Sequence, residues 1–236
     1  MYWKLKAKIQ NTVSLLPSSA SYATYYWIQR HFGGLKKISP VSALTAGVEI
    51  WGRIKKLGSD PTGKVFLEIG TGRVPIIPVA YWLMGAKSII TIDLNPYMKA
   101  DLLMGCLQYV IDSTEEIEKL FGSLLDSERL NDLLHFYKGT RFSMSSFLDF
   151  FRIKYIAPGN AAKTELNEQS VDFHTSYNVL EHIPPKVLKG IFEEGNRIIS
   201  NNGLFIHRYR LQRSFLALGQ NDICNQFSSI LRLRVG

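Results

Sequence analysis

The chain has 236 residues, a formal net charge of +8 and two cysteines, Cys106 and Cys224, that lie far apart in the sequence. This length fits one α/β domain with extensions, and the isolated cysteines argue against a disulfide framework or a structural zinc site. Apolar runs fall short of the roughly 20 residues that span a bilayer, and the N-terminus fits a cleavable signal peptide poorly. These features favour a reducing, cytoplasmic location.

The positive charge is concentrated at the two ends of the chain. Residues 1–60 contain nine Lys and Arg against two Asp and Glu, and residues 207–236 contain five against one. Basic surfaces of this kind are usually solvated faces, and they also fit an anionic partner. We therefore keep two interpretations, a solvated surface and a peripheral membrane contact through basic N-terminal helices.

Residues 1–60 have the pattern of a helical N-terminal extension. Three helices are predicted near 3–15, 21–32 and 41–57, with Pro17 and Gly33-Gly34 between them. In the third, apolar residues recur at helical spacing at Leu44, Val48, Trp51 and Ile54. A second domain is expected over 61–236.

Strands and helices alternate from Pro61 onward. Strands are predicted at Val65–Ile69, Ser88–Asp93, Ile153–Ala157, Val171–Ser176 and Leu204–His207, helices at 75–85 and 184–199, and a turn at Asn201-Asn-Gly203. This alternation predicts an α/β fold, a Rossmann-like, doubly wound and mainly parallel sheet. Only Ser228–Val235 reads as a further strand, so the C-terminal strands are expected to be incomplete.

The segment between the second and third strands is longer than a simple crossover. Residues 98–152 are rich in apolar side chains at helical spacing, which predicts a helical insertion. Because it leaves the second strand at its carboxyl end, where ligands bind in such sheets, we expect a cap over the site. The alternative is that it packs beside the sheet without touching ligand.

A glycine-rich turn follows the first strand in the sequence Glu68-Ile-Gly70-Thr71-Gly72. Glycines there allow a tight turn and a close approach of ligand to backbone. A dinucleotide fingerprint would need a third glycine where Pro75 stands, and no Walker A motif is present. The turn therefore favours a ligand without phosphates, such as S-adenosyl-L-methionine (SAM).

Polar residues end the next strands, where they would meet the rest of such a ligand. Asp93 is placed to accept hydrogen bonds from two ribose hydroxyls, with Leu94 beside it, or else to cap a helix starting near Pro96. Asn160 and Ala161 follow the third strand and either meet the adenine or form a plain turn. Tyr177 and Asn178 lie at the tip of the fourth strand, in the expected cofactor pocket.

Taken together, LEIGTG at 67–72, the strand ending in Asp93, and VLEHIP at 179–184 resemble the class I SAM-dependent methyltransferases, in a bacterial subgroup of that family. The resemblance covers about residues 62–207. It implies a sheet usually of seven strands, with SAM contacts at Glu68, Gly70, Gly72, Asp93 and Asn160. The chain departs from the pattern at Val74, where the family has a glycine, at the uncharged Asn160, and in the tail at Arg210, Arg213 and Ser214.

Methyl transfer requires a base only when the acceptor must lose a proton. His207 and His182 are the candidate catalytic residues, with a structural role under the site as the alternative for His182, and His174 is expected to pack. No metal site is predicted, because Asn178 replaces the first acid of a Glu-x-x-Glu-His motif.

The expected activity is SAM-dependent methylation of a small-molecule or a glycan- or lipid-linked acceptor. The alternative is a catalytically impaired SAM-fold binding protein with a divergent C-terminus. Nucleic acid is disfavoured as a substrate, because no Asn-Pro-Pro-Tyr or Asp-Pro-Pro-Tyr follows the fourth strand. The weak aromatic and basic pattern at Tyr22, Tyr25, Tyr26, Trp27, Arg30 and His31 fits a packed amphipathic helix equally well.

Overall fold

A computed structural model describes residues 24, 26, 28, 30, 39–139 and 142–208 of the chain. The chain divides into two units, Met1–Ser39 and Pro40–Gly236. Residues 24, 26, 28 and 30 are helical, in keeping with the helix expected at 21–32. The expected helix 3–15, the strand Ser228–Val235, and the tail positions Arg210, Arg213 and Ser214 lie outside the described residues.

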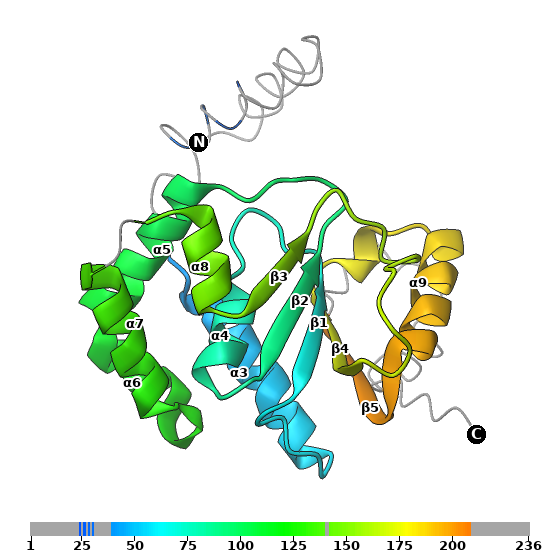
Figure 1. Cartoon of the computed structure of the whole chain (residues 1–236), viewed down its shortest axis with the longest axis horizontal. Helices are drawn as coiled ribbons and strands as arrows, with labels where there is room; N and C mark the ends of the chain where they lie inside the picture. Colours follow the sequence, from blue (N-terminus) through cyan, green and yellow to red (C-terminus); the bar gives the residue numbers. More distant parts are fainter. Residues whose placement is uncertain are drawn as a thin grey trace, which may run out of the picture. The chain divides into compact units, whose positions relative to one another are not determined.

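The second unit alternates helices and strands along the chain (Figure 1). Its elements are α3 (Val41–Lys56), β1 (Val65–Ile69), α4 (Ile76–Leu83), β2 (Ser88–Ile92), α5 (Ala100–Asp112), α6 (Thr114–Phe121), the 3-10 turn η1 (Gly122–Leu124), α7 (Ser127–Gly139), α8 (Met144–Phe150), β3 (Ile153–Ile156), β4 (Val171–Tyr177), the 3-10 turn η2 (Leu180–His182), α9 (Pro185–Ile198) and β5 (Ile199–Arg208).

The five strands form one parallel sheet in the order β3-β2-β1-β4-β5. This is the strand order of a doubly wound fold, so the predicted Rossmann-like α/β class is confirmed. The predicted turn at Asn201-Asn-Gly203 falls inside the span of β5, where the chain folds back: a Cβ built on Gly203 would lie 2.4 Å from Ile199 Cγ1 and 3.0 Å from the Ser200 carbonyl oxygen. Val171 pairs with Ile199 and Phe173 with Leu204, so the extra residues form an irregularity inside a longer β5.

Helices cover both faces of the sheet, as a doubly wound fold requires. Alternate residues of β1 face opposite ways. Phe66 packs in an aromatic cluster with Trp51 of α3 and Tyr81 of α4, whereas Leu67 packs with Ile198 of α9. Figure 1 shows α9 on one side of the sheet and the helices from α3 to α8 on the other.

The entry helix α3 is part of the sheet's core. Leu44, Ile50, Trp51 and Ile54 are buried, and the Trp51 ring stacks on Phe66 with centroids 5.6 Å apart. The boundary drawn near residue 60 from composition therefore differs from the compact unit, which begins at Pro40. The basic residues of α3 occupy its exposed last turn. Their charge made the helix resemble a separate basic extension in the sequence.

The segment between β2 and β3 is helical, as predicted, and forms α5 to α8. Its main anchor is Arg129 of α7, whose guanidinium donates to the carbonyl oxygens of Trp82 (2.6 Å) and Ala86 (2.8 Å). The Trp82 ring also contacts Phe150 and Phe151. These contacts lie at the C-terminal end of α4, at the edge of the sheet where the strands begin.

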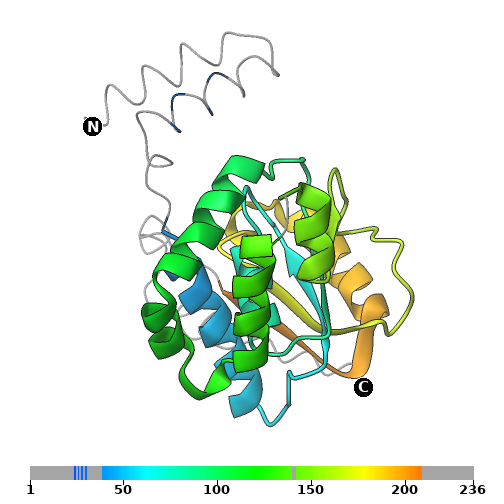
Figure 2. The ribbon, with the colours of Figure 1, turned by 60° about the vertical axis from the view of Figure 1, so that its left-hand side comes forward.

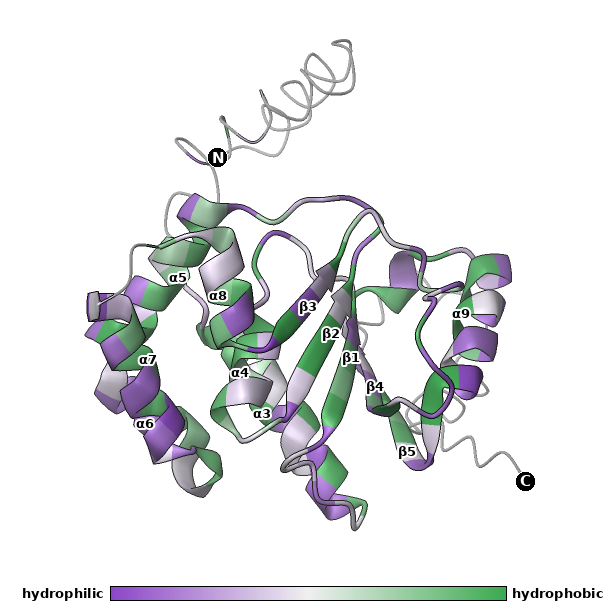
Figure 3. Ribbon diagram, viewed as in Figure 1, coloured by the Kyte–Doolittle hydropathy of each residue, from purple (hydrophilic) through white to green (hydrophobic). Residues whose placement is uncertain are grey.

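The later helices of the insertion, α7 and α8, pack on α4 and β3 (Figure 2 shows these helices in green), which is the arrangement of the alternative interpretation, and the cap over the carboxyl edge stays a prediction. The entry of the insertion remains close to the glycine turn, because the Lys99 N–H donates to the Arg73 carbonyl at 3.0 Å. In Figure 3, β1 and β2 are coloured as hydrophobic, whereas α6 and α7 show hydrophilic faces. The burial of apolar helix faces against the rest of the unit is enough to explain how the insertion packs. Among the described residues, none of the helices has the length and apolar character to cross a membrane.

Candidate cofactor site at the carboxyl edge of the sheet

The glycine turn after β1 contains two residues with positive φ. Gly70 has φ +84° and Gly72 has φ +64°, values that side-chain-bearing residues rarely adopt. The Gly70 N–H donates to the Ile92 carbonyl at 2.8 Å, which fixes the turn to the end of β2. Thr71 is nearly buried, and its hydroxyl lies 2.5 Å from that of Thr91. The turn is thus tied to the neighbouring strand by backbone and side chain.

Asp93 follows β2 and uses both of its carboxylate oxygens. One oxygen accepts from the Gly72 N–H at 2.8 Å, and the other accepts from the Asn95 N–H at 3.1 Å. The alternative that Asp93 caps the next helix is wrong, because α5 begins at Ala100 with Lys99 at its N-cap. The side chain of the adjacent Leu94 is 74% exposed, which is unusual for a large apolar residue beside a polar turn.

The loop after β3 carries Asn160 and Ala161. The Asn160 side-chain oxygen accepts from the Ala162 N–H at 2.9 Å, as in an Asx turn, and the Asp93 carbonyl accepts from the Gly159 N–H at 2.8 Å. This second bond brings the loop beside Asp93. Asn160 therefore shapes the turn, which is one of the two interpretations given for it above. The turn lies on the side of Asp93 where the adenine of SAM is expected.

The same loop is fastened to α9 by a carboxylate. Glu194 accepts from the N–H of Thr164 at 2.8 Å and from its hydroxyl at 2.6 Å, and it pairs with Arg197 at 2.8 Å. The hydrogen bond from Arg197 is the largest cause that lowers the pKa of Glu194 to about 2. Arg197 also donates to the Leu166 carbonyl at 2.7 Å. The loop is thus held at its start by Asp93 and its own Asn160 turn, and further along by α9.

Glu68 lies beneath the turn and does not open onto the carboxyl edge. Its side chain is 2% exposed, and its carboxylate accepts from the Tyr81 hydroxyl at 3.3 Å and from the Thr175 hydroxyl. Burial raises the pKa of Glu68 to about 7, although both hydrogen bonds oppose this. The direct SAM contact that the resemblance implies for Glu68 does not fit this burial, and any effect of Glu68 on a bound cofactor would pass through β1, α4 and β4.

A pH-dependent stability follows from the buried Glu68. Its folded pKa exceeds its unfolded value of 4.5, so its stabilising effect is complete below pH 4.5 and is lost as the pH rises through 7. Glu68→Gln keeps an acceptor oxygen and removes this titration. From pH 5 to pH 8, we expect wild type to lose about 2–3 kcal/mol of unfolding free energy relative to the variant.

Urea unfolding of both proteins at each pH measures that difference. Other groups titrate alike in the two chains and cancel, including the buried histidines described below. A constant difference across the pH range would show that Glu68 titrates near its ordinary pKa.

Tyr177 and Asn178 end β4 beside the end of β5. The Asn178 N–H donates to the Arg208 carbonyl at 2.8 Å, and Asn178 adopts a positive φ of 54°. The Arg208 guanidinium lies 5.2 Å from the centre of the Tyr177 ring and pairs with Glu49 of α3. The β4 tip is thus held by β5 on one side and, through Arg208, by α3 on the other.

His207 does not stand open at the carboxyl edge. Its Nδ1 lies 2.8 Å from the Ser176 hydroxyl, its Nε2 is buried, and its ring packs edge-on to His174 and Phe192. Burial lowers the pKa of His207 to about 4 and that of His174 well below its ordinary value. The ring is thus engaged by Ser176 and by neighbouring rings, and His207 as a general base stays a prediction.

His182 lies in η2, and its side chain is exposed. The structural role under the site, the alternative offered for it, is therefore wrong. Its exposure near the β4 tip leaves it able to meet solvent or an acceptor. No group of three His, Cys, Asp or Glu side chains that could hold a metal ion occurs in the part of the chain that the structure describes.

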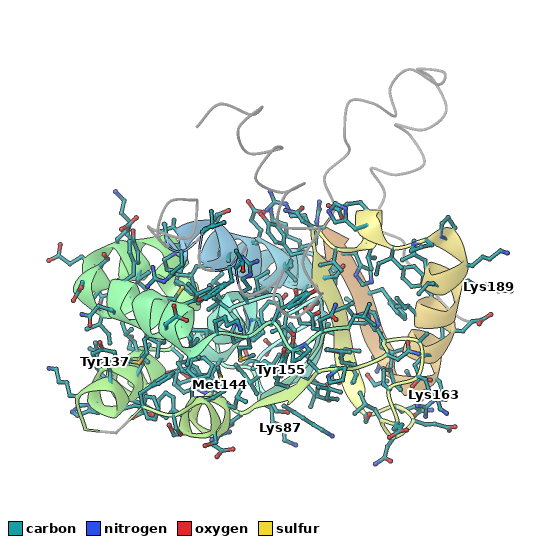
Figure 4. The ribbon with its side chains drawn as sticks, turned by 90° about the horizontal axis from the view of Figure 1, so that it is seen from above. Lys87, Tyr137, Met144, Tyr155, Lys163 and Lys189 are labelled. Atoms are coloured by element: carbon teal, nitrogen blue, oxygen red, sulfur yellow. The ribbon has the colours of Figure 1, made fainter. Side chains whose placement is uncertain are left out.

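Seen from above, the site edge lies between the helical insertion, where Tyr137 and Met144 are labelled, and the α9 side, where Lys163 and Lys189 are labelled (Figure 4). The structure brings Gly70, Gly72, Asp93, Leu94, Asn160, Tyr177 and Asn178 to this edge and places Glu68 and His207 below it. Sequence reasoning missed Tyr81, Thr175, Glu49 and Val179. Their partners are distant in sequence, so no local spacing indicates them.

The sequence matches no protein-family profile and no curated protein sequence. Among solved structures, it resembles a candidate SAM-dependent methyltransferase from Methanococcus maripaludis, with 14% identity, a TM-score of 0.43 and 79% of this chain covered. It also resembles phosphoethanolamine N-methyltransferase 1 from Haemonchus contortus, with 17% identity, a TM-score of 0.37 and 70% of this chain covered. A third similar structure is geranyl diphosphate C-methyltransferase from Streptomyces coelicolor, with 14% identity, a TM-score of 0.39 and 69% of this chain covered. The chain spans 61%, 26% and 44% of these proteins, respectively. Likeness this distant carries no information on activity.

Proposed function

We propose that this chain binds SAM at the carboxyl edge of its sheet and methylates a small-molecule or a glycan- or lipid-linked acceptor. The observation that carries the proposal is the bond between Asp93 and the Gly72 N–H, which joins the ends of β1 and β2. The strand order reverses between β1 and β4, and doubly wound sheets bind ligands at such a switch point.

The residues at this edge fit the parts of SAM. A Cβ built on Gly72 would meet no atom within 4 Å, so the backbone there has open space for a ligand. Asp93 supplies a charged acceptor for ribose hydroxyls, and the exposed Leu94 supplies an apolar surface for a base.

Bound SAM supplies an electrophilic methyl group, which moves to a lone pair of the acceptor as its bond to sulfur breaks and leaves S-adenosylhomocysteine. The chain's contribution is alignment, which can lower such a barrier by roughly 7–11 kcal/mol. The Gly72 turn and Asp93 would hold the donor, and the β4 tip at Tyr177 and Asn178 faces the acceptor side.

The rival proposal is a SAM-fold binding protein without catalysis, and the burial of His207 favours it. Turnover separates the two. We expect repeated formation of S-adenosylhomocysteine when the full chain is incubated with SAM and a fractionated extract of small molecules and glycolipids. Binding of SAM with no S-adenosylhomocysteine beyond a heat-inactivated control would support the binding protein instead.

A further inference from the structure

Val179 packs directly on the first glycine of the turn. A Cβ built on Gly70 would lie 2.4 Å from one methyl carbon of Val179 and 2.9 Å from the other, distances that real Cβ atoms essentially never show. Gly70 is thus covered by an isopropyl group that comes from the end of β4. At Gly72, two residues later, the same construction meets no atom within 4 Å. The two glycines therefore have different roles.

The position of Val179 is set from β5. The preceding residue, Asn178, has a positive φ of 54° and donates its N–H to the Arg208 carbonyl. The Val179 carbonyl in turn accepts from the His182 N–H at 3.0 Å, which closes η2. Backbone bonds on both sides therefore place the Val179 side chain over Gly70.

We propose that Val179 is a positioning residue, which seals the Gly70 side of the turn and directs the cofactor to the open side at Gly72. This inference rests on the proposed function. A turn with two positive-φ glycines has a large conformational freedom when it is unrestrained, and ordering it would cost binding free energy. Packing by Val179 orders the turn beforehand and ties it to the strand that faces the acceptor.

The proposal predicts an effect on affinity that depends on side-chain shape. We expect Val179→Ala to weaken SAM binding roughly five- to tenfold, because the turn loses the one restraint that packs directly on Gly70, while its hydrogen bonds to β2 and Asp93 remain. Val179→Thr keeps the branched shape but places a hydroxyl beside the turn, so we expect it to bind SAM less tightly than wild type and more tightly than Val179→Ala. The matched control is Val187→Ala, which removes the same two methyl groups from a 46% exposed valine on α9. Calorimetry measures the affinities, and thermal melts verify that each variant is folded.

A double-mutant cycle tests the packing itself without SAM. Alanine at either Gly70 or Gly72 would have to adopt a positive φ, which is strained. Only alanine at Gly70 would also clash with the Val179 side chain. Val179→Ala should therefore recover part of the melting temperature lost by Gly70→Ala and none of that lost by Gly72→Ala. If the Gly70 variant does not fold alone, recovery of folding in the double variant supports the contact. If the Gly70 single variant and the double variant both remain unfolded, the SAM affinities of Val179→Ala, Val179→Thr and Val187→Ala test the proposal instead.

Each outcome has a distinct meaning. Wild-type affinity in Val179→Ala, or an equal loss in Val187→Ala, would overturn the positioning role while leaving SAM binding in place. Absence of SAM binding by wild type would overturn the proposed function, and with it the assignment of Val179 to a cofactor. Weak binding in Val179→Ala with partial rescue in Val179→Thr would support the proposal.

Discussion

Replacing Asp93 by Ala is expected to weaken SAM binding by about 10- to 100-fold while the fold remains intact. In the structure this carboxylate holds the Gly72 N–H and the Asn95 N–H. The variant therefore loses both a restraint on the turn and the charged acceptor proposed for the ribose. Hydrogen bonds to charged groups contribute roughly 1.5–3 kcal/mol each, which sets the expected range.

Two further variants sharpen this measurement by calorimetry. Asp93→Asn keeps one acceptor oxygen without the charge and should fall between wild type and Ala. Asp60→Ala is the matched control, because Asp60 accepts from the Thr62 N–H in an exposed turn before β1, away from the carboxyl edge. An affinity within twofold of wild type in Asp93→Ala would show that the adenosine does not lie beside this residue.

The largest loss of stability is expected from Phe66→Ala, at about 3–5 kcal/mol of unfolding free energy. Phe66 is fully buried, and its ring lies 5.6 Å from Trp51, 4.4 Å from Tyr81 and 5.0 Å from Phe173, measured between ring centres. These contacts join α3, α4 and β4 through β1. Because whole domains are stable by only about 5–15 kcal/mol, the variant should sit near its unfolding threshold.

Chemical denaturation provides the unfolding free energies for this comparison. Phe66→Leu retains most of the apolar volume and should cost clearly less. Phe142→Ala removes the same ring at a half-buried position before α8, where we expect at most about 1–2 kcal/mol. Equal losses in the Phe66 and Phe142 alanine variants would contradict the assignment of Phe66 to the centre of the core.

Strand positions followed from the sequence because each buried strand is a short apolar run bounded by turn residues. Val65–Ile69 and Ser88–Ile92 illustrate this, since glycine, proline or aspartate marks their ends. The site edge was predictable for the same reason, because Gly70, Gly72 and Asp93 directly follow those strands. The Asn201-Asn-Gly203 segment indicated a turn, but its place inside β5 depends on the pairing with β4 on both sides of it, which the local sequence does not indicate.

The remaining features depend on contacts between distant parts of the chain. Burial of His207 beside Phe192 and His174 determines its pKa, and no local pattern reveals which face of β5 it occupies. The insertion packs beside the sheet through Arg129, which donates to the carbonyls of Trp82, in the last turn of α4, and Ala86, beyond it, and sequence spacing does not indicate these partners. Val179 covers Gly70 through the pairing of β4 with β1.

Calorimetric titration of the full chain with SAM tests the central claim most directly. The arrangement of Gly72, Asp93 and Leu94 predicts saturable binding with a micromolar dissociation constant, which corresponds to about −8 kcal/mol. S-adenosylhomocysteine should compete at the same site, because it shares the ribose and adenine that these residues would hold. An absence of heat and of any thermal shift at millimolar SAM would contradict the claim that the carboxyl edge of this sheet is a SAM site.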